Sequence, residues 1–303
     1  MRYLIVGAGA VGGYLAALLQ ESGHRVTLLV RPERARTLAR DGLVLAEPDG
    51  PTSAFPMETV TADTVRPEYD VVLLSVKAYA LPGAIADLRG AIGPDTVVIP
   101  SLNGIAHIEA LDAAFPGQVL GGVCLTATEL RDDGAIRILR PGATLGFGEL
   151  DGRDTERVRR IADDLSDSPI ESSASTTIVA DMWEKWLLLA SGGATNTLLG
   201  ADVGRIVAAD GGARTAEAVV DEVVDVMTRA GHAPRADAVE RARGVLTEAG
   251  SRFTTSMYRD HRAGRPVEVE AVLGDLVRRA DRLDTPAPLL AAAAAALRIT
   301  PES

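Results

Sequence analysis

The sequence is poor in cysteine and has no long apolar run. Cys124 is the only cysteine among 303 residues, which excludes a disulfide within the chain and favours a reducing compartment. No segment reaches the roughly 18 apolar residues of a membrane span. Glycines interrupt the first apolar stretch, and no cleavage region follows it, which argues against a signal peptide. We therefore expect a cytoplasmic protein.

An excess of positive charge is also missing. The formal net charge is −11, which disfavours nucleic acids and anionic membranes as partners. A small anionic substrate remains compatible with this charge, because one local basic site is enough to bind it. Apolar residues make up 47% of the chain, which is sufficient for a core, and the length suggests two domains. We expect a small-molecule ligand and no metal ion.

The chain starts with an apolar stretch that runs into a glycine-rich turn. Residues 2–6 (RYLIV) precede Gly7, Ala8, Gly9, Ala10, Val11 and Gly12. In a dinucleotide site the first glycine allows a tight turn, the second admits a pyrophosphate, and the third lets the helix pack closely on the strand. The helix N-terminus then faces the phosphates with free N–H groups. An ordinary glycine turn is the alternative, but the strand before the motif and the apolar-spaced helix after it favour a dinucleotide.

Strand and helix patterns alternate in the first half of the chain. Continuous apolar runs, such as residues 69–76, are typical of parallel strands that are covered on both faces. This alternation predicts an α/β fold that begins with a Rossmann doubly wound sheet. A hairpin is expected at residues 140–142 (RPG). Strands are predicted at residues 2–6, 25–30, 69–76, 96–100, 119–126, 135–139, 143–147 and near 170, and helices at residues 11–21, 32–40 and 153–165.

Helical patterns fill the rest of the chain. The strand patterns fade after the Ser- and Thr-rich stretch 171–177. We therefore expect a dinucleotide-binding domain over residues 1–175 and a C-terminal all-helical domain over residues 176–303. The helices of that domain are predicted at residues 178–199, 212–230, 236–248, 255–262, 267–283 and 288–297.

The end of the second strand indicates which nicotinamide cofactor is bound. Sites for NAD usually place an acid there for the ribose 2′-hydroxyl, whereas sites for NADP place a cation there for the 2′-phosphate. Arg31 follows this strand directly, and the acid is missing. A solvated helix start is the alternative, and it is the interpretation that we favour for Arg34 and Arg36. Arg31 therefore predicts NADP(H).

Polar residues follow two further strands. Lys77 and Asn103 come after apolar runs, at the carboxyl ends where ligands bind in such sheets. A surface lysine and an Asn-Gly turn are the structural alternatives. Their shared location favours a place near the cofactor for both.

The helical half contains three more polar candidates. Lys185 interrupts the most apolar part of a helix, where it either lines a cleft or pairs with Asp181 four residues earlier. Ser256, taken alone, could be a helix cap. Glu268, taken alone, could be a first-turn acid that interacts favourably with the helix dipole.

Taken in order, these motifs resemble the ketopantoate reductase family over essentially the whole chain. The shared motifs are the glycine turn, Ser-Val-Lys77, Asn103-Gly104, Trp-Glu-Lys185, Ser256-Met257 and Gly-Arg-Pro-Val-Glu268. The resemblance implies a Rossmann domain, a helical domain and NADPH-dependent reduction of 2-dehydropantoate to pantoate, a step toward pantothenate. It also implies a homodimer.

The resemblance also assigns roles to these residues. It implies that Lys185 is the catalytic lysine and that Glu268 is its acidic partner. It implies that Asn103 and Ser256 contact the substrate, and that Asn103 and Lys77 lie near the cofactor. The chemistry agrees, because hydride addition to a ketone leaves negative charge on oxygen, which an ammonium stabilises and protonates. A carboxylate beside the lysine keeps it charged.

The helix after Lys185 departs from the family's pattern. Family members usually carry asparagine four and eight residues after the lysine, on the same helix face, whereas this chain has Leu189 and Gly193. Asn196 is the nearest amide and is therefore a further candidate for substrate binding. The alternative substrate is a less polar 2-keto acid or another ketone. A non-catalytic dinucleotide-binding sensor is the alternative of another class, but a sensor needs neither Lys185 nor its acidic partner.

Overall fold

The computed structural model describes residues 1–48 and 50–299 of the chain. These residues form two compact units. The N-terminal unit comprises Met1–Leu102 and His107–Val179, and the helical unit comprises Asn103–Ala106 and the residues from Ala180 onward. The short segment that carries Asn103 is thus grouped with the helices, although the sequence places it among the strands.

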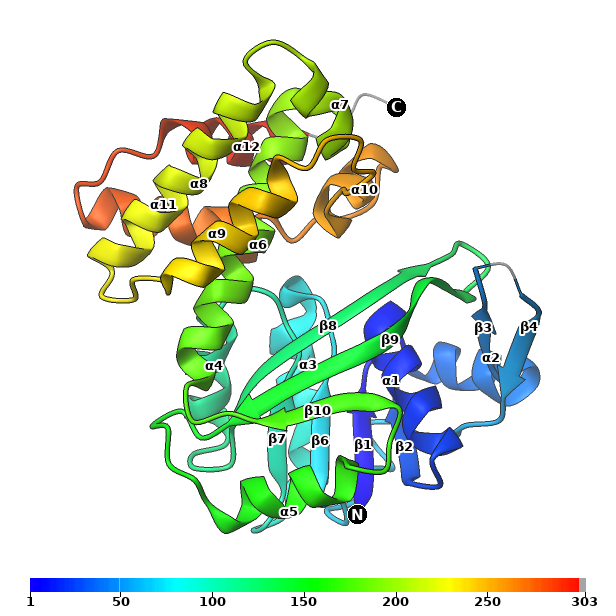
Figure 1. The fold of residues 1–303 in the computed structure, drawn as a ribbon. Helices are drawn as coiled ribbons and strands as arrows, with labels where there is room; N and C mark the ends of the chain where they lie inside the picture. Colours follow the sequence, from blue (N-terminus) through cyan, green and yellow to red (C-terminus); the bar gives the residue numbers. More distant parts are fainter. Residues whose placement is uncertain (49, 300–303) are drawn as a thin grey trace. The chain divides into compact units, whose positions relative to one another are not determined.

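A parallel sheet of five strands forms the centre of the N-terminal unit (Figure 1). Its strand order is β5-β2-β1-β6-β7, and all neighbouring strands run parallel. The predicted Rossmann-type sheet is therefore confirmed. The strands are β1 (Arg2–Val6), β2 (Arg25–Leu29), β5 (Glu58–Val60), β6 (Val71–Leu74) and β7 (Val97–Pro100). The helices along this part of the chain are α1 (Ala10–Glu21), α2 (Pro32–Asp41), α3 (Leu81–Leu88), α4 (Ala106–Ala114) and α5 (Glu156–Leu165).

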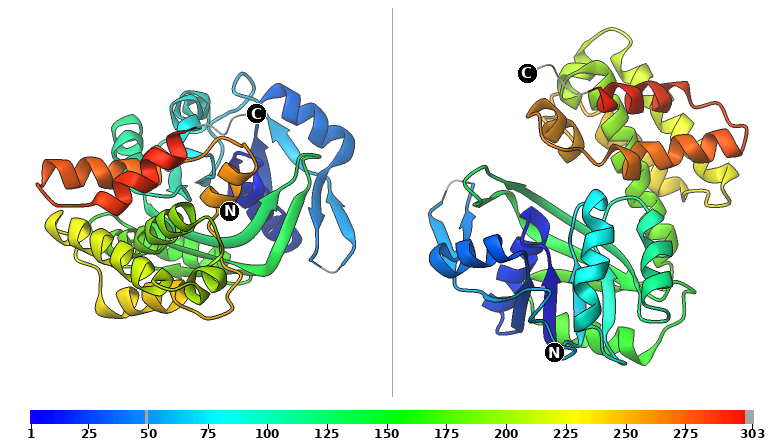
Figure 2. Two further views of the ribbon diagram at one scale, coloured as in Figure 1. Left: turned by 90° about the horizontal axis from the view of Figure 1, so that it is seen from above. Right: turned by 180° about the vertical axis from the view of Figure 1, so that it is seen from behind.

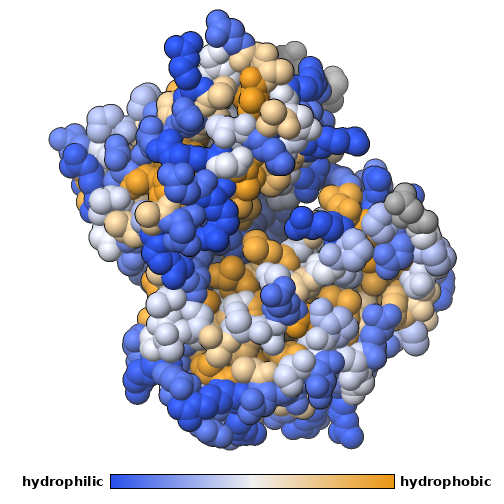
Figure 3. All heavy atoms as spheres, viewed as in Figure 1, coloured by the Kyte–Doolittle hydropathy of each residue, from blue (hydrophilic) through white to orange (hydrophobic). Residues whose placement is uncertain are grey.

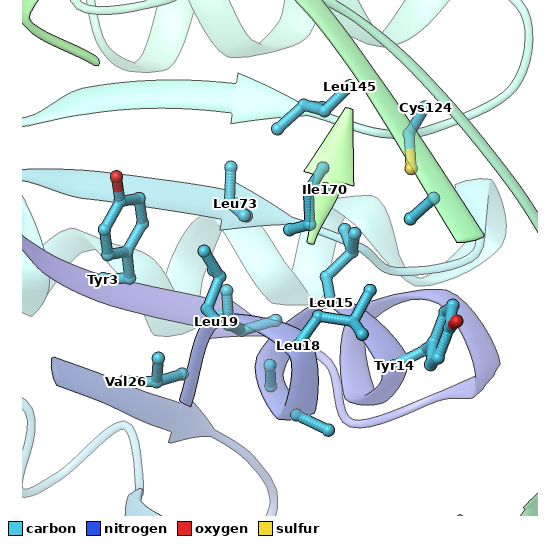
Figure 4. Packing of buried hydrophobic residues seen from close by; sticks show 14 of the residues in the cluster. Tyr3, Tyr14, Leu15, Leu18, Leu19, Val26, Leu73, Cys124, Leu145 and Ile170 are labelled. Carbon is cyan, nitrogen blue, oxygen red and sulfur yellow. The ribbon is translucent and has the colours of Figure 1, made fainter. Parts of the chain in front are cut away.

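The parallel sheet is buried on both faces, which explains its continuous apolar runs. Tyr3 and Ile5 of β1 belong to one core, and Leu4 and Val6 belong to another on the opposite face. Successive side chains of a strand point to opposite faces, so both positions have to be apolar. Figure 4 shows the first core, where side chains of α1 meet those of the two sheets; it includes Leu15, Leu18, Leu19, Leu73, Leu145 and Ile170.

A second sheet has the order β10-β9-β3-β4, and β8 pairs with β9. Its strands are β3 (Leu43–Ala46), β4 (Thr52–Phe55), β8 (Gly121–Leu130), β9 (Ile136–Gly148) and β10 (Ile170–Ala174). The sequence predicts residues 119–126 as part of the parallel sheet, and this prediction is wrong. β8 runs antiparallel to β9, while Val119 before it forms an isolated parallel bridge with Val98.

The hairpin predicted at residues 140–142 is wrong as well. β9 continues through this stretch, and the chain reverses between β8 and β9 instead, where the Arg131 N–H donates to the Ala135 carbonyl. The partners of β8 jump from Ala143 to Arg140, so that Pro141 and Gly142 are left over as a bulge. A bulge accommodates proline, which cannot donate a ladder hydrogen bond.

The second unit is helical, as predicted (Figure 2). Where the sequence predicts a continuous helix over residues 267–283, the structure has a π-helical turn, Glu270–Gly274, followed by α11. The helices are α6 (Ile178–Leu199), α7 (Val203–Ala208), α8 (Gly212–Arg229), α9 (Ala236–Leu246), α10 (Ser256–Arg262), α11 (Asp275–Arg282) and α12 (Pro288–Arg298).

Within residues 1–48 and 50–299, no helix combines the length and apolar character needed to cross a bilayer. On the face drawn in Figure 3, hydrophilic residues surround the apolar patches of both units.

Candidate functional site

The glycine turn joins β1 to α1. Two of its glycines, Gly7 and Gly12, cannot be replaced by another residue without a shift of the backbone. Gly7 has a φ of +98°, and a Cβ there would lie 2.7 Å from the carbonyl oxygen of Ser75. A Cβ on Gly12 would lie 2.1 Å from the carbonyl oxygen of Gly7. Both distances are far below van der Waals contact. Gly7 and Gly12 therefore serve the turn and the helix packing, as the motif predicts.

Gly9 has a different environment, because the space beside it is open. A Cβ on Gly9 would meet no atom within 4 Å. Gly9 is also the N-cap of α1 and supplies no side-chain hydrogen bond there. The first N–H groups of α1, from Ala10 and Val11, form the positive end of the helix dipole. Open space beside a helix N-terminus suits a pyrophosphate, so these residues fit a bound dinucleotide.

Three predicted cofactor segments follow neighbouring strands of the parallel sheet. Val6 at the end of β1 lies opposite Leu29 of β2 and Leu74 of β6. Arg31 comes shortly after β2, the glycine turn follows β1, and Lys77 comes shortly after β6. The carboxyl edge of the sheet therefore carries a cation on each side of the glycine turn.

Arg34 is a third cation beside this turn, which the sequence alone suggests is solvated. Its guanidinium donates to the carbonyl oxygen of Gly134 at 3.3 Å and to that of Ala8 at 3.5 Å. Burial lowers the pKa of Arg34 below its ordinary value, but an arginine keeps its charge at neutral pH. The sequence does contain a signal for this position of Arg34. Arg34 comes three residues after Arg31, and residues three apart lie on the same side of a helix.

Lys185 occupies a half-buried position on α6 between two buried tryptophans. The rings of Trp183 and Trp186 lie 5.1 Å apart, and the Arg279 guanidinium lies over both. Asp181, considered above as a lysine partner, accepts a hydrogen bond from Arg235 at 2.6 Å. The aromatic packing thus fixes the turn of α6 that presents Lys185.

The π-helical turn links the helix of Lys185 to the segment of Glu268. The indole N–H of Trp186, the residue after Lys185, donates to the Val272 carbonyl at 2.8 Å. The Val272 N–H in turn donates to the Glu268 carbonyl at 3.1 Å. Glu268 itself is buried, with 8% of its surface exposed. A buried carboxylate needs a charged or hydrogen-bonding partner. Through Val272, these two hydrogen bonds connect the backbone of Glu268 to the residue that follows Lys185.

The same π-helical turn also contacts the segment of Asn103. Gly104 has a φ of +73°, and a Cβ there would lie 2.3 Å from the Ala271 carbonyl oxygen. Only glycine permits this approach of two backbones. Asn103, Lys185 and Glu268 are therefore each within a few residues of one short turn, although 165 positions separate the first from the last (268 − 103). π-helical turns inside helices occur frequently at functional sites.

Ser256 begins α10 and is exposed. The helix cap is the preceding residue, Thr255, whose hydroxyl accepts from the Tyr258 N–H at 3.4 Å. The capping role considered for Ser256 therefore belongs to Thr255. The hydroxyl of Ser256 is thus not needed to begin the helix.

The surroundings of Asn196 do not fit the predicted direct contact with substrate. Its side chain is fully buried. Its amide oxygen accepts from the Thr255 N–H at 2.9 Å, and its amide nitrogen donates to the Ala201 carbonyl at 3.0 Å. Both ends of the amide are thus bound to backbone. Asn196 holds the residue before Ser256 and fixes the start of α10.

Among residues 1–48 and 50–299, no group of three or more His, Cys, Asp or Glu is arranged to hold a metal ion. Cys124 is buried on β8.

Comparison with known proteins places the chain among oxidoreductases. Residues 3–152 match the family described as ketopantoate reductase PanE/ApbA, and residues 177–300 match the C-terminal part of the same family. An uncharacterized oxidoreductase of Bacillus subtilis, YkpB, is 36% identical over 291 residues, which cover 96% of this chain and 95% of that protein.

Solved structures share the fold. A PanE/ApbA family ketopantoate reductase from Ralstonia eutropha has a TM-score of 0.86 at 24% identity and covers 98% of this chain and 97% of its own. A D-mandelate dehydrogenase, solved with NADH and anilino(oxo)acetate, has a TM-score of 0.87 at 20% identity and the same coverage.

These matches identify the chain as an oxidoreductase that is built from a Rossmann-type sheet and a helical unit. Both halves match one family along nearly the whole chain. The chain belongs to the ketopantoate reductase family.

Proposed function

We propose that this chain reduces a 2-keto acid to the 2-hydroxy acid with NADPH, as in the conversion of 2-dehydropantoate to pantoate on the way to pantothenate. The observation that carries the proposal is the π-helical turn, which gathers the segments of Asn103, Lys185 and Glu268. In the reaction, the ammonium of Lys185 stabilises the negative charge on the former keto oxygen and donates the proton. Glu268 orients this ammonium and keeps it charged.

The use of lysine in this sequence supports the role of Lys185. Of the 31 lysine and arginine residues, only Lys77 and Lys185 are lysines. Arginine keeps its proton in proteins, whereas lysine gives a proton up readily when its pKa is shifted. Surface ion pairs such as Arg235–Glu184 and Arg278–Glu270 use arginine. The two exceptions are both residues that we assign to the site.

Substrate turnover tests the proposal. Purified protein should oxidise NADPH in the presence of 2-keto acids from a panel that includes 2-dehydropantoate, and the loss of NADPH absorbance should match the amount of 2-hydroxy acid formed. Binding of NADPH without turnover of any member would instead support the non-catalytic sensor, which is the alternative of another class.

Arg31 is the residue that we propose selects NADPH over NADH. Its place at the N-cap of α2, just beyond β2, suits contact with the 2′-phosphate. Arg31→Ala should weaken NADPH binding by about tenfold, in line with one charged hydrogen bond, and leave NADH binding nearly unchanged. Titration of both cofactors measures the ratio. Arg36→Ala, on the same helix and exposed, is the control; equal losses for both cofactors would rule out a role for Arg31 in selection.

Assembly, location and the remaining site residues belong to the same proposal. We propose a cytoplasmic homodimer that binds a small 2-keto acid. Lys77 and Asn103 are assigned to the cofactor, and Asn103 and Ser256 to the substrate.

A further inference from the structure

The face of α6 that carries Lys185 is apolar beyond the lysine. Residues three, four, seven and eight positions later share a helix face, and here they are Leu188, Leu189, Gly192 and Gly193. None of these four has a side chain that forms hydrogen bonds. Asn196 comes next along this face, but its amide is bound to backbone at both ends. At these four positions α6 therefore offers no side-chain partner for a hydroxyl group of a substrate, and the nearby hydroxyls of Ser191 and Thr195 belong to residues that are fully buried.

Met257 occupies the space that a side chain at position 193 would need. A Cβ on Gly193 would lie only 2.5 Å from the terminal methyl carbon of Met257. Met257 is buried, with 6% of its surface exposed, and it directly follows Ser256. Gly192 has similar surroundings, since a Cβ there would lie 3.1 Å from the methyl carbon of Thr255. Carbon atoms are thus the nearest neighbours at both positions. The Thr255 hydroxyl oxygen, which accepts from the Tyr258 N–H, lies farther away, at 3.9 Å from a Cβ on Gly193.

We infer that the substrate is a 2-keto acid whose side chain is apolar and carries no hydroxyl group, and that Gly193 and Met257 set this preference. The inference rests on the proposed function and names the substrate class of the same site. A hydroxyl placed among carbon atoms loses its hydrogen bonds to water without replacement, whereas an apolar group gains from burial. An apolar pocket rejects an added hydroxyl only moderately, so the expected preference is about 10- to 100-fold.

Two substrates that differ by one hydroxyl test this directly. Trimethylpyruvate has the carbon skeleton of 2-dehydropantoate and lacks only its hydroxyl group. The unmodified protein with NADPH should show a kcat/KM about 10- to 100-fold higher for trimethylpyruvate. An equal or higher value for 2-dehydropantoate would overturn the inference and leave the proposed function standing. If NADPH binds but no 2-keto acid is reduced, the proposed function fails, and the inference fails with it.

Two variants test the role of the residues themselves. Gly193→Asn combined with Met257→Ala supplies an amide and the room for it, and should move the ratio of the two kcat/KM values at least tenfold toward 2-dehydropantoate. Leu189→Asn, at a half-buried position, should move it in the same direction and does not disturb Met257. The control is Gly244→Asn on α9, where a Cβ would meet no atom within 4 Å, and the ratio should stay unchanged. An unchanged ratio in folded Leu189→Asn protein would show that this face of α6 does not contact the substrate side chain.

Discussion

Replacing Lys185 with alanine should lower kcat by about 10²- to 10⁴-fold, because the variant lacks both the proton donor and the positive charge beside the developing oxyanion. NADPH affinity should stay nearly the same, since the glycine turn, Arg31 and Lys77, which we assign to the cofactor, belong to the N-terminal unit. Single-turnover oxidation of NADPH with a 2-keto acid in excess measures the chemical step, and fluorescence titration measures the affinity. The half-buried position of Lys185 on α6 makes unfolding of the variant unexpected.

Lys185→Arg separates the two contributions of the lysine. Arginine preserves the charge but does not release a proton near neutral pH. If proton donation dominates, this variant should be nearly as slow as the alanine variant. If the charge alone matters, arginine should restore most of the rate, and the role of Lys185 as general acid would have to be abandoned. Unchanged turnover in the alanine variant would refute the mechanism as a whole.

The parallel sheet was predictable because its physical requirements act on short stretches of sequence. Tyr3, Leu4, Ile5 and Val6 are consecutive and apolar since the strand is covered on both sides. Gly7 and Gly12 follow from steric limits within one turn, where a Cβ would strike a backbone carbonyl. Burial on both faces and steric limits within one turn act on neighbouring residues, so they can be recognised in the sequence without knowledge of the rest of the fold.

The prediction that residues 119–126 belong to the parallel sheet is wrong because the partner of a strand is not determined by its local sequence. An apolar run such as residues 121–125 suits a parallel strand and an antiparallel strand equally well. Its pairing with β9 depends on a chain reversal at residues 131–135 and not at Pro141, which is the stronger turn signal. Proline fits there only because Pro141 and Gly142 bulge out of the ladder.

In the candidate site, too, some features could be predicted from the sequence and others could not. Lys185 and Glu268 could be proposed from the chemistry that a lysine and an acid perform, and from the order of motifs along the chain. The π-helical turn could not, because one extra residue in a turn leaves no trace in apolar periodicity over residues 267–283. The position of Asn196 along the helix from Lys185 makes it a candidate for substrate binding. In the structure, however, its amide forms hydrogen bonds with the backbone of Thr255 and Ala201. A side chain's partners depend on the loops packed against it.

Gly9→Ala should weaken NADPH binding by about 10- to 100-fold while the protein stays folded. An added methyl group meets no protein atom within 4 Å, so the free protein tolerates it, and the change at an N-cap should alter the free energy of unfolding by only about 1 kcal/mol or less. The methyl group does, however, fill the space in which we place the pyrophosphate, and the loss of its charged hydrogen bonds corresponds to about 1.5–3 kcal/mol. Fluorescence titration with NADPH and thermal unfolding measure the two effects separately.

Gly83→Ala on α3 is the matched control for this substitution, because a Cβ at Gly83 also meets no atom within 4 Å. It should change neither cofactor binding nor stability by a large amount. Gly12→Ala is the opposite case, because its Cβ would lie 2.1 Å from the Gly7 carbonyl oxygen. This variant should destabilise the turn even without a ligand. If Gly9→Ala bound NADPH as tightly as the unmodified protein, the pyrophosphate would not lie against Gly9. The glycine turn would then be a packing device for β1 and α1, which is the alternative that the sequence left open.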